Sequence, residues 1–429
     1  MTLPPGPSTP PLVQTMRWVA RPLAFMQQAR RSYGEVFSVR FAGFKTPMVM
    51  VSDPDLVKAT YSKPANRLPE GRIALLEPVL GKKSVILLDG EEHMARRKLM
   101  LPAFHGERMR SYEEVMKQAI DREIETWPVD EAFPIHPRMQ AVTLEVILRT
   151  VFGVDTGDRL DRLRVLLGKS LEDTAAAGWQ VLNLFTQRFG GPAGPPGFTG
   201  NLRQVDDELA GLIHERRLDP GLGEREDILS MMAAAEFADG TRMDEGELRD
   251  QLMTLLLAGH ETTATALAWT FDLILSDPRV LARLKSELDE GGDEYLRATI
   301  TEALRLRPVI PIAGRILDQP LEVDGFQLEA GANVAPSIWM AHTRADSFPD
   351  PFAFKPERFL ENPPETYSWI PYGGGVRRCL GAAFAEFEMR VVLTEVLTRC
   401  DLQLAGSTPQ RIARRNITLS PKDGTPVVV

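Results

Sequence analysis

The sequence contains, between positions 371 and 381, the segment Pro371-Tyr372-Gly373-Gly374-Gly375-Val376-Arg377-Arg378-Cys379-Leu380-Gly381. It places one of the two cysteines in a glycine-rich loop, directly before residues 382–397, whose pattern predicts an amphipathic helix. Backbone N–H groups near the sulfur and the positive end of the following helix favour a thiolate over a thiol. Glycines carry no Cβ, so a flat ligand can approach the backbone closely. A thiolate in such a place is suited to bind iron.

Length, composition and charge are those of an ordinary globular protein. The 429 residues, 43% hydrophobic and 25% charged, are sufficient for a large core. A formal net charge of −9 argues against a nucleic-acid partner. Two cysteines do not make a disulfide scaffold and predict a reducing, cytoplasmic location. No apolar run approaches the roughly 20 residues of a membrane span, so we expect no membrane anchor.

Periodicity and turn residues predict mainly helices, with short strands towards both ends of the chain. We expect an extended, proline-rich start, a helix opened by Asp53-Pro54, and mostly helices from residue 91 to about 398. A loop rich in glycine and proline covers 190–197. The predicted strands are 37–41, 48–51, 333–338, 417–419, 427–429 and a hairpin over 321–328 with Asp-Gly at its turn.

No clean linker interrupts the pattern, which predicts a single domain over residues 1–429. We expect a β-rich lobe drawn from about 35–62, 315–340 and 405–429. A larger helical lobe would come from about 91–305 and 380–400. The predicted fold class is therefore mainly α with a smaller β-rich lobe (α+β).

The cysteine loop resembles the haem-binding loop of cytochrome P450s, Phe-x-x-Gly-x-Arg-x-Cys-x-Gly, with a tyrosine where that family usually has phenylalanine. The loop residues concerned are Tyr372, Gly373, Gly375, Arg377, Cys379 and Gly381. The resemblance implies the cytochrome P450 fold, haem b (iron protoporphyrin IX) as cofactor, and Cys379 as the ligand of its iron. A phosphate-binding loop is excluded because the lysine that it requires is absent.

A predicted long helix over 247–275 carries polar residues inside a run of leucine and alanine. Taken alone, this pattern leaves two possibilities open. The helix opens locally at a functional site, or a threonine hydroxyl is bonded to a backbone carbonyl one turn earlier. A His-Glu-x-x-His zinc site is excluded because position 264 is alanine.

The same helix resembles the P450 pattern Ala-Gly-x-(Asp/Glu)-Thr-(Thr/Ser). The matching residues are Ala258, Gly259, Glu261, Thr262 and Thr263. The resemblance implies that Thr262 supports dioxygen and a proton-delivering water, and that Glu261 feeds the proton relay. Ala258 and Gly259 would lie against the haem, and the glycine would leave a groove for dioxygen.

Glu302 and Arg305 lie three residues apart on one predicted helix face, and Pro356-Glu357-Arg358-Phe359 follows downstream. Taken alone, Glu302 and Arg305 are equally compatible with a common surface ion pair. Together with Arg358 they resemble the buried Glu–Arg–Arg network of P450s, which implies a structural role in supporting the cysteine loop.

Four cationic residues match positions that contact the haem propionates in the family. His93 and Arg97 stand one helical turn apart, and Arg315 and Arg377 lie further along the chain. For His93 and Arg97 a solvated basic helix face is the alternative.

By family position, the substrate pocket would include aliphatic residues, with about 68–86 and 170–205 closing its top. The residues concerned are Val309, Ile310, Ile312, Ile417 and Leu419. They favour an apolar substrate such as a fatty acid, terpenoid, steroid or polyketide. Simple core packing of these side chains stays an open alternative.

The resemblance implies a haem-thiolate monooxygenase that uses dioxygen and inserts one oxygen atom into an apolar molecule. With no reductase domain in the sequence, electrons would come from NAD(P)H through a ferredoxin or flavodoxin. That partner would dock on the Cys379 side, at a basic patch of Arg96, Lys98, Arg377 and Arg378. The alternatives are a peroxide-driven peroxygenase or isomerase on the same fold, and a haem sensor or carrier without turnover.

Overall fold

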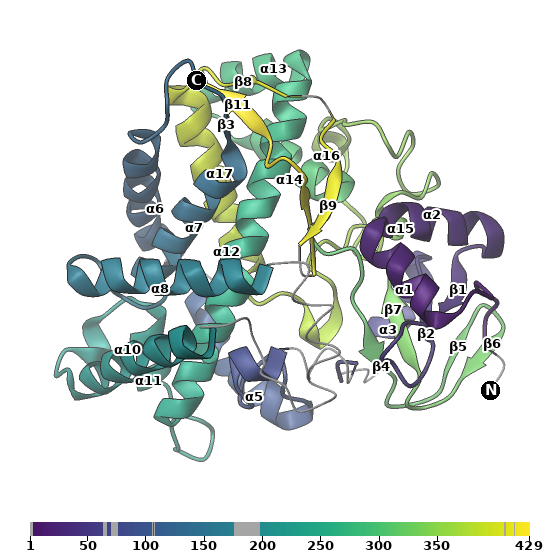
Figure 1. The fold of residues 1–429 in the computed structure, drawn as a ribbon, viewed down its shortest axis with the longest axis horizontal. Helices are drawn as coiled ribbons and strands as arrows, with labels where there is room; N and C mark the ends of the chain where they lie inside the picture. Colours follow the sequence, from purple (N-terminus) through teal and green to yellow (C-terminus); the bar gives the residue numbers. More distant parts are fainter. Residues whose placement is uncertain are drawn as a thin grey trace. The chain divides into compact units, whose positions relative to one another are not determined.

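The computed structural model describes residues 3–62, 67–69, 76–104, 106, 108–175, 198–406, 409–415 and 417–429. The predicted loop at 190–197 and much of the predicted 170–205 segment lie outside these residues. The chain divides into two compact units, whose helices and strands are labelled in Figure 1. Unit 1 comprises Met1–Leu75, Ser276–Cys379 and Arg411–Lys422, and unit 2 comprises Leu76–Leu275, Leu380–Gln410 and Asp423–Val429.

Unit 1 contains the main sheet and several helices around it. Its helices are α1 (Pro11–Ala20), α2 (Pro22–Tyr33), α3 (Pro54–Ser62), α13 (Pro278–Asp289), α14 (Glu294–Leu306), α15 (Ile338–His342), α16 (Arg358–Glu361) and the 3-10 turn η3 (Gly375–Arg377). Its strands are β1 (Val36–Val39), β2 (Met48–Val51), β4 (Arg315–Ile316), β5 (Leu321–Val323), β6 (Phe326–Leu328), β7 (Asn333–Pro336), β9 (Ile412–Arg415) and β10 (Thr418–Pro421).

The main sheet of unit 1 has the strand order β1-β2-β7-β4. Strand β2 is antiparallel to β1 and parallel to β7, with Val49 opposite Val334. Strand β2 is Met-Val-Met-Val and is buried along its whole length, because both faces of the sheet are covered.

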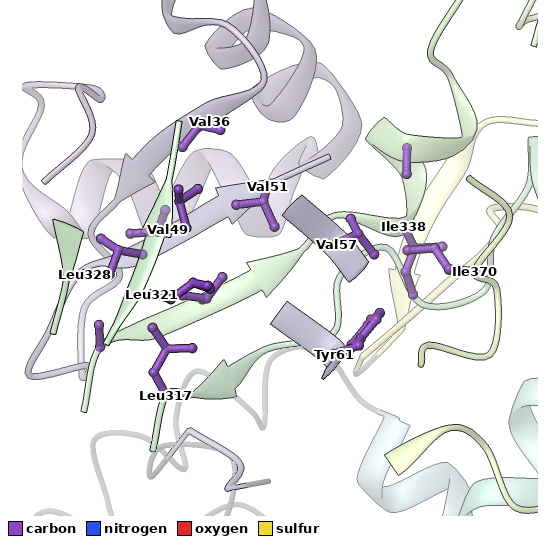
Figure 2. Close-up of a cluster of buried hydrophobic side chains, with 14 residues drawn as sticks. Val36, Val49, Val51, Val57, Tyr61, Leu317, Leu321, Leu328, Ile338 and Ile370 are labelled. Carbon is purple, nitrogen blue, oxygen red and sulfur yellow. The ribbon is translucent and has the colours of Figure 1, made fainter. Parts of the chain in front are cut away.

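The two faces of this sheet support two separate cores, since side chains alternate along a strand. Val49 and Val51 belong to one cluster, together with Val57 and Tyr61 of α3 (Figure 2). Met48 and Met50 point to the other cluster, which contains side chains of α1 and α2 such as Trp18. Helix α3 thus covers one face of the sheet, and its last turn carries Tyr61.

Several local predictions are confirmed by unit 1. Asp53 accepts hydrogen bonds from the N–H groups of Asp55 (3.0 Å) and Leu56 (3.4 Å), as expected at a helix start. Strands β5 and β6 form the predicted hairpin, with positive φ at Asp324 and Gly325 (50° and 77°), as in a tight two-residue turn. The strand predicted at 37–41 is β1, which begins and ends one and two residues earlier.

The prediction of an extended start holds only for residues 3–10. Residues 11–20 and 22–33 are helices, and each begins with a proline at its first position. Proline at that position costs no hydrogen bond and presets a helical φ, so prolines here begin helices rather than preventing them.

Unit 2 is mainly helical. Its helices are α5 (Gly90–Met100), η1 (Leu101–Phe104), α6 (Arg108–Ile124), α7 (Ile135–Thr150), α8 (Asp158–Ala175), α10 (Phe198–Leu218), η2 (Leu222–Glu224), α11 (Ile228–Ala234), α12 (Glu245–Ser276) and α17 (Ala382–Arg399). Three short strands, β3 (Phe133–Pro134), β8 (Gln403–Leu404) and β11 (Pro426–Val428), form a small sheet in the order β3-β11-β8.

Helix α17, predicted for residues 382–397, is confirmed and packs along α6. Phe384 contacts the rings of Phe104 and Tyr112 at centroid distances of 6.1 and 5.8 Å. Cys400, just after this helix, is buried, and burial raises the pKa of its thiol, as expected for an inert core cysteine.

Candidate functional site

The cysteine loop of unit 1 is closed by its own backbone. Gly373 N–H donates to the carbonyl of Ile370 (2.9 Å), and Cys379 N–H donates to the carbonyl of Tyr372 (3.0 Å). Between these bonds, η3 brings the chain round, and Cys379 ends the loop as an exposed residue. The loop therefore presents its sulfur-bearing residue at the surface of the described chain.

Tyr61 gives the glycines of the loop a structural role. A Cβ on Gly374 would lie 2.5 Å from a ring carbon of Tyr61, and a Cβ on Gly375 would lie 2.7 Å from the Tyr61 carbonyl oxygen. Gly375 also has φ of 66°, a conformation that side-chain-bearing residues rarely adopt. At these two positions glycine is required by the packing of α3 against the loop, whereas the sequence suggested only ligand access.

The structure brings Glu302, Arg305 and Arg358 together in unit 1. Arg305 donates to both carboxylate oxygens of Glu302 (2.6 and 2.8 Å), and Arg358 Nε donates to Glu302 Oε1 (3.2 Å). Glu302 and Arg305 are fully buried. The backbone N–H of Lys355 also donates to Glu302 (2.9 Å), so the carboxylate is surrounded by donors.

His342 connects this network to the cysteine loop, a link that sequence reasoning missed. Arg305 donates to the carbonyl of His342 (2.8 Å), and His342 Nδ1 lies 3.1 Å from the Arg305 carbonyl. His342 Nε2 accepts a hydrogen bond from Ile370 N–H (2.8 Å). An accepting Nε2 requires a neutral ring, and burial lowers the pKa of His342 to about 3. The network therefore holds the chain just before the loop.

Arg315, on β4 of unit 1, is buried but has no carboxylate partner among the described residues. Its guanidinium donates to the neighbouring carbonyl of Gly314 (2.9 Å) and lies 5.7 Å from the centroid of the Tyr61 ring. Burial lowers the pKa of Arg315. A buried cation without an anion is costly, so this is a place where an added carboxylate would be stabilised.

The predicted pocket residues of unit 1 differ in their surroundings. The backbone joins Leu419 to Val309, with a hydrogen bond of 2.8 Å from N–H to carbonyl. Ile310 and Ile312 are half-buried against the two cores of the sheet, so core packing accounts for part of each side chain. Ile417 is exposed and Leu419 is buried.

In unit 2, helix α12 runs through the polar patch without a break. Thr262 Oγ1 donates to the carbonyl of Ala258 one turn earlier (2.6 Å). The possibility of a locally opened helix is thus wrong, and the alternative of a bonded threonine is the one observed. Ala258 is exposed and Thr262 partly exposed, although the helix is buried at most other positions. One face of α12 is therefore left uncovered at mid-helix.

Glu261 is held by side chains that include two from α7. Gln140 Nε2 donates to Glu261 Oε2 (2.6 Å), and Thr265 Oγ1 donates to Oε1 (3.3 Å). His136 Nε2 lies 3.8 Å from the same Oε1 and 3.2 Å from Thr265 Oγ1. Sequence reasoning missed His136 and Gln140; their spacing of four residues on a mostly apolar helix was the available signal.

Gly259 and His260 also pack against α7. A Cβ on Gly259 would lie 3.1 Å from Ile147 Cδ1, so glycine permits the close approach of the two helices. His260 Nδ1 lies 2.9 Å from Thr143 Oγ1, and burial lowers the pKa of His260 to about 4. His260 is thus a neutral, bonded core residue.

On α5 of unit 2, His93 is buried and Arg97 lies one turn later on the same helix. Arg96, between them, forms an ion pair with Glu247 (Nε to Oε1, 2.6 Å) and stacks over the ring of Phe237 at 5.0 Å. An arginine bound in this way is a poor docking cation, so the structure does not support the inclusion of Arg96 in the predicted basic patch. Lys98 and Arg378 are exposed.

Comparison with known proteins identifies the family of this arrangement. The family model described as Cytochrome P450 matches residues 4–427. The chain is 37% identical over 436 residues to a putative cytochrome P450 135B1 of Mycobacterium tuberculosis, covering 100% of this chain and 92% of that protein. It is 36% identical to a putative cytochrome P450 137 of the same species, covering 92% and 83%.

Among solved structures, a retinoic acid-bound cyanobacterial CYP120A1 matches with a TM-score of 0.84 over 100% of this chain and 99% of that one. At 24% sequence identity, this likeness establishes the fold, which is the mainly helical one predicted with small sheets. Within the described residues, no helix combines the length and the apolar character that crossing a membrane requires.

Proposed function

The chain belongs to the cytochrome P450 family and is a cytochrome P450 monooxygenase, and on that premise we propose that it oxidises an apolar small molecule with electrons from a separate ferredoxin or flavodoxin. One oxygen atom of dioxygen would enter the substrate. A cytoplasmic location is part of the same proposal.

The side chains present fit a haem b. Cys379 is exposed at the end of a loop that its own backbone holds closed, and Arg315 is a buried cation without a carboxylate among the described residues. When bound, haem supplies an iron at which dioxygen is activated with two electrons and two protons. By resemblance, the residues that would hold it are Cys379 as ligand, with His93, Arg97, Ala258, Gly259, Arg315, Tyr372, Gly373, Arg377 and Gly381 as contacts.

The uncovered face of α12 is the observation that carries the proposal. Ala258 and Thr262 are one turn apart and accessible in the middle of a helix that is otherwise largely buried. A methyl group and a hydroxyl suit a small apolar molecule that needs one polar contact. The partly exposed aliphatic side chains of Val309 and Ile310 support the same substrate class.

Proton supply would depend on Glu261. Gln140 occupies its Oε2, while Oε1 lies near Thr265 and the buried ring of His136. A proton would therefore enter on the Oε1 side, and Glu261 would then have to leave Gln140 to pass it towards Thr262. The Thr262 hydroxyl donates its proton in a hydrogen bond to the Ala258 carbonyl, and its oxygen has lone pairs left to accept a bond from water.

The first test is the reduced, carbon monoxide-bound difference spectrum of the purified protein. We expect the strongly red-shifted Soret band of thiolate-ligated haem. Cys379→Ala should abolish it, whereas the matched control Cys400→Ala should keep it, since Cys400 is a buried core residue. A red-shifted band in Cys379→Ala, or no haem in the unaltered protein, would contradict the proposal.

Turnover tests the proposed substrate class and electron source. A panel of fatty acids, terpenoids, steroids and polyketides is screened for the low-to-high-spin shift, and the best compound is then incubated under three conditions. Product formed with NAD(P)H and a ferredoxin or flavodoxin system supports the monooxygenase. Product formed only with added peroxide would indicate a peroxygenase. Product formed with neither reductant nor peroxide would indicate an isomerase, and no product would indicate a sensor or carrier.

The partner surface is tested at Arg378, which is exposed and has no ion-pair partner among the described residues. An acidic ferredoxin or flavodoxin would be attracted to it. Arg378→Glu should lower the rate at limiting ferredoxin, and the effect should diminish at high salt. Arg31→Glu, the same charge change at an exposed position on α2, is the control. An unchanged rate in Arg378→Glu would count against this surface.

A further inference from the structure

Tyr61 has a buried hydroxyl group without a hydrogen-bond partner among the described residues. The residue is 7% exposed and lies on the last turn of α3, in the cluster that covers one face of the sheet (Figure 2). If the residue served only to fill that core, phenylalanine would do so without burying an unsatisfied oxygen. The hydroxyl therefore requires an explanation beyond packing.

Arg315 lies next to Tyr61 and is a buried cation without an anion among the described residues. Its guanidinium faces the Tyr61 ring at 5.7 Å, is 5% exposed, and bonds only the carbonyl of Gly314 among the described residues. One donor hydroxyl and one uncompensated cation are thus enclosed side by side in unit 1. A single carboxylate would satisfy both.

The cysteine loop holds Tyr61 in place. The ring lies against Gly374, and its hydroxyl oxygen would be 3.8 Å from a Cβ on Gly373. Helix α3 also packs on η3, the turn that precedes Cys379. Burial raises the pKa of Tyr61 to about 12, so the hydroxyl keeps its proton and acts as a donor at any working pH.

We propose that the Tyr61 hydroxyl and the Arg315 guanidinium together form a carboxylate-binding site, and that its ligand is one propionate of the haem. The inference rests on the proposed function, and it adds Tyr61 as a positioning residue that the family motifs do not include. Because Tyr61 also packs on the loop of Cys379, a propionate bonded there couples the edge of the haem to the loop of its iron ligand.

The test compares Tyr61→Phe with the unaltered protein, each purified with haem and each reconstituted with haem dimethyl ester, whose propionates carry no charge. Haem loss is followed by transfer to excess apomyoglobin. Removal of a hydrogen bond to a charged group should make haem loss from Tyr61→Phe about ten- to a hundredfold faster than from the unaltered protein. With the dimethyl ester, the two proteins should lose the cofactor at the same rate.

Val57→Ala is the matched control, because Val57 lies one turn earlier on α3 in the same cluster and carries no polar atom. Any change in cofactor loss that Val57→Ala causes relative to the unaltered protein should be the same with haem as with its dimethyl ester. The propionate bending bands in the resonance Raman spectrum, which report hydrogen bonding and not activity, should shift in Tyr61→Phe and stay in Val57→Ala.

Equal haem loss and unchanged propionate bands in Tyr61→Phe would overturn the inference while leaving a thiolate-type spectrum, and hence the proposed function, intact. A protein without any haem spectrum would overturn both. If Tyr61→Phe fails to fold, Arg315→Met and the unaltered protein supply the test. The unaltered protein should then lose the dimethyl ester faster than haem, and in Arg315→Met this difference should shrink; equal rates in the unaltered protein would overturn the inference.

Discussion

Arg305 and Arg315 are ten residues apart, lie in the same unit and are both buried, yet their surroundings are opposite. Arg305 bonds both oxygens of Glu302 and the carbonyls of His342, Pro351 and Ala353. Arg315 bonds one carbonyl, and no carboxylate lies within reach among the described residues. A buried cation that is paired with a carboxylate indicates a structural role, whereas a buried cation without an anion indicates a place for a ligand.

Two buried carboxylates differ in the same way. Glu302 is surrounded by donors from two arginines and a backbone N–H. Glu388, on α17 of unit 2, is equally buried, but its Oε1 has no partner among the described residues. Burial raises the pKa of Glu388 to about 8. Partners, more than burial, thus decide whether an enclosed group keeps its charge.

The largest effect is expected for Arg305→Met. It leaves the fully buried Glu302 without its bidentate partner, which costs about 3–5 kcal/mol of unfolding free energy. Urea unfolding followed by circular dichroism measures this loss. A change below about 1 kcal/mol would mean that the network is not the support of the cysteine loop that its geometry indicates.

Glu388→Gln should have the next largest effect, and only at higher pH. Below about pH 4.5 both folded and unfolded states hold the proton; between about 4.5 and 8 the folded state binds more protons, so stability falls as pH rises. Above about pH 8 the folded protein bears the full free-energy cost of a buried, ionised Glu388. Glutamine carries no charge, so the unfolding free energy of the variant should exceed that of the unaltered protein by about 1–3 kcal/mol near pH 8.

The measurement is urea unfolding at several pH values between 5 and 8.5, with the difference between the two proteins plotted against pH. The difference should be small at pH 5 and increase with a slope of at most about 1.4 kcal/mol per pH unit. A constant difference across the range would show that Glu388 is already ionised in the folded protein.

Arg315→Met should act in the opposite direction from Arg305→Met in the haem-free protein. Removal of a buried cation that lacks an anion should raise the unfolding free energy by about 1–2 kcal/mol. The same variant should hold haem less firmly. If haem-free Arg315→Met is as unstable as Arg305→Met, the two arginines have the same structural role.

Arg159→Met should have the smallest effect. Arg159 binds Glu215 with two hydrogen bonds of 2.6 and 2.7 Å through its two terminal nitrogens. This pair is bidentate, like that of Arg305 and Glu302, but its side chains are accessible to water. Water screens this pair, so its loss should cost less than about 1 kcal/mol. Thermal unfolding is sufficient to show this, and a cost equal to that of Arg305→Met would contradict the dependence on burial.

Some elements could be predicted from local sequence because their causes are local. The Asp324-Gly325 turn follows from residues that accept positive φ, and the start of α3 follows from Asp53 and Pro54. Helices α1 and α2 were not predicted, although Pro11 and Pro22 stand at their first positions, where proline favours a helix start. At Thr262 the local sequence left two possibilities, which only hydrogen-bond geometry could separate.

The sequence alone was sufficient for the family, because the motifs of the cysteine loop and of α12 are short and their spacing is set along the chain. The tertiary structure was needed for the contacts of Glu261 with Gln140, 121 residues away, and of Tyr61 with the loop before Cys379. Such contacts join segments that no local period relates. Whether a buried Arg315 has an anion, or a buried Tyr61 a hydrogen bond, depends on all the segments that enclose it and becomes visible only when they are folded together.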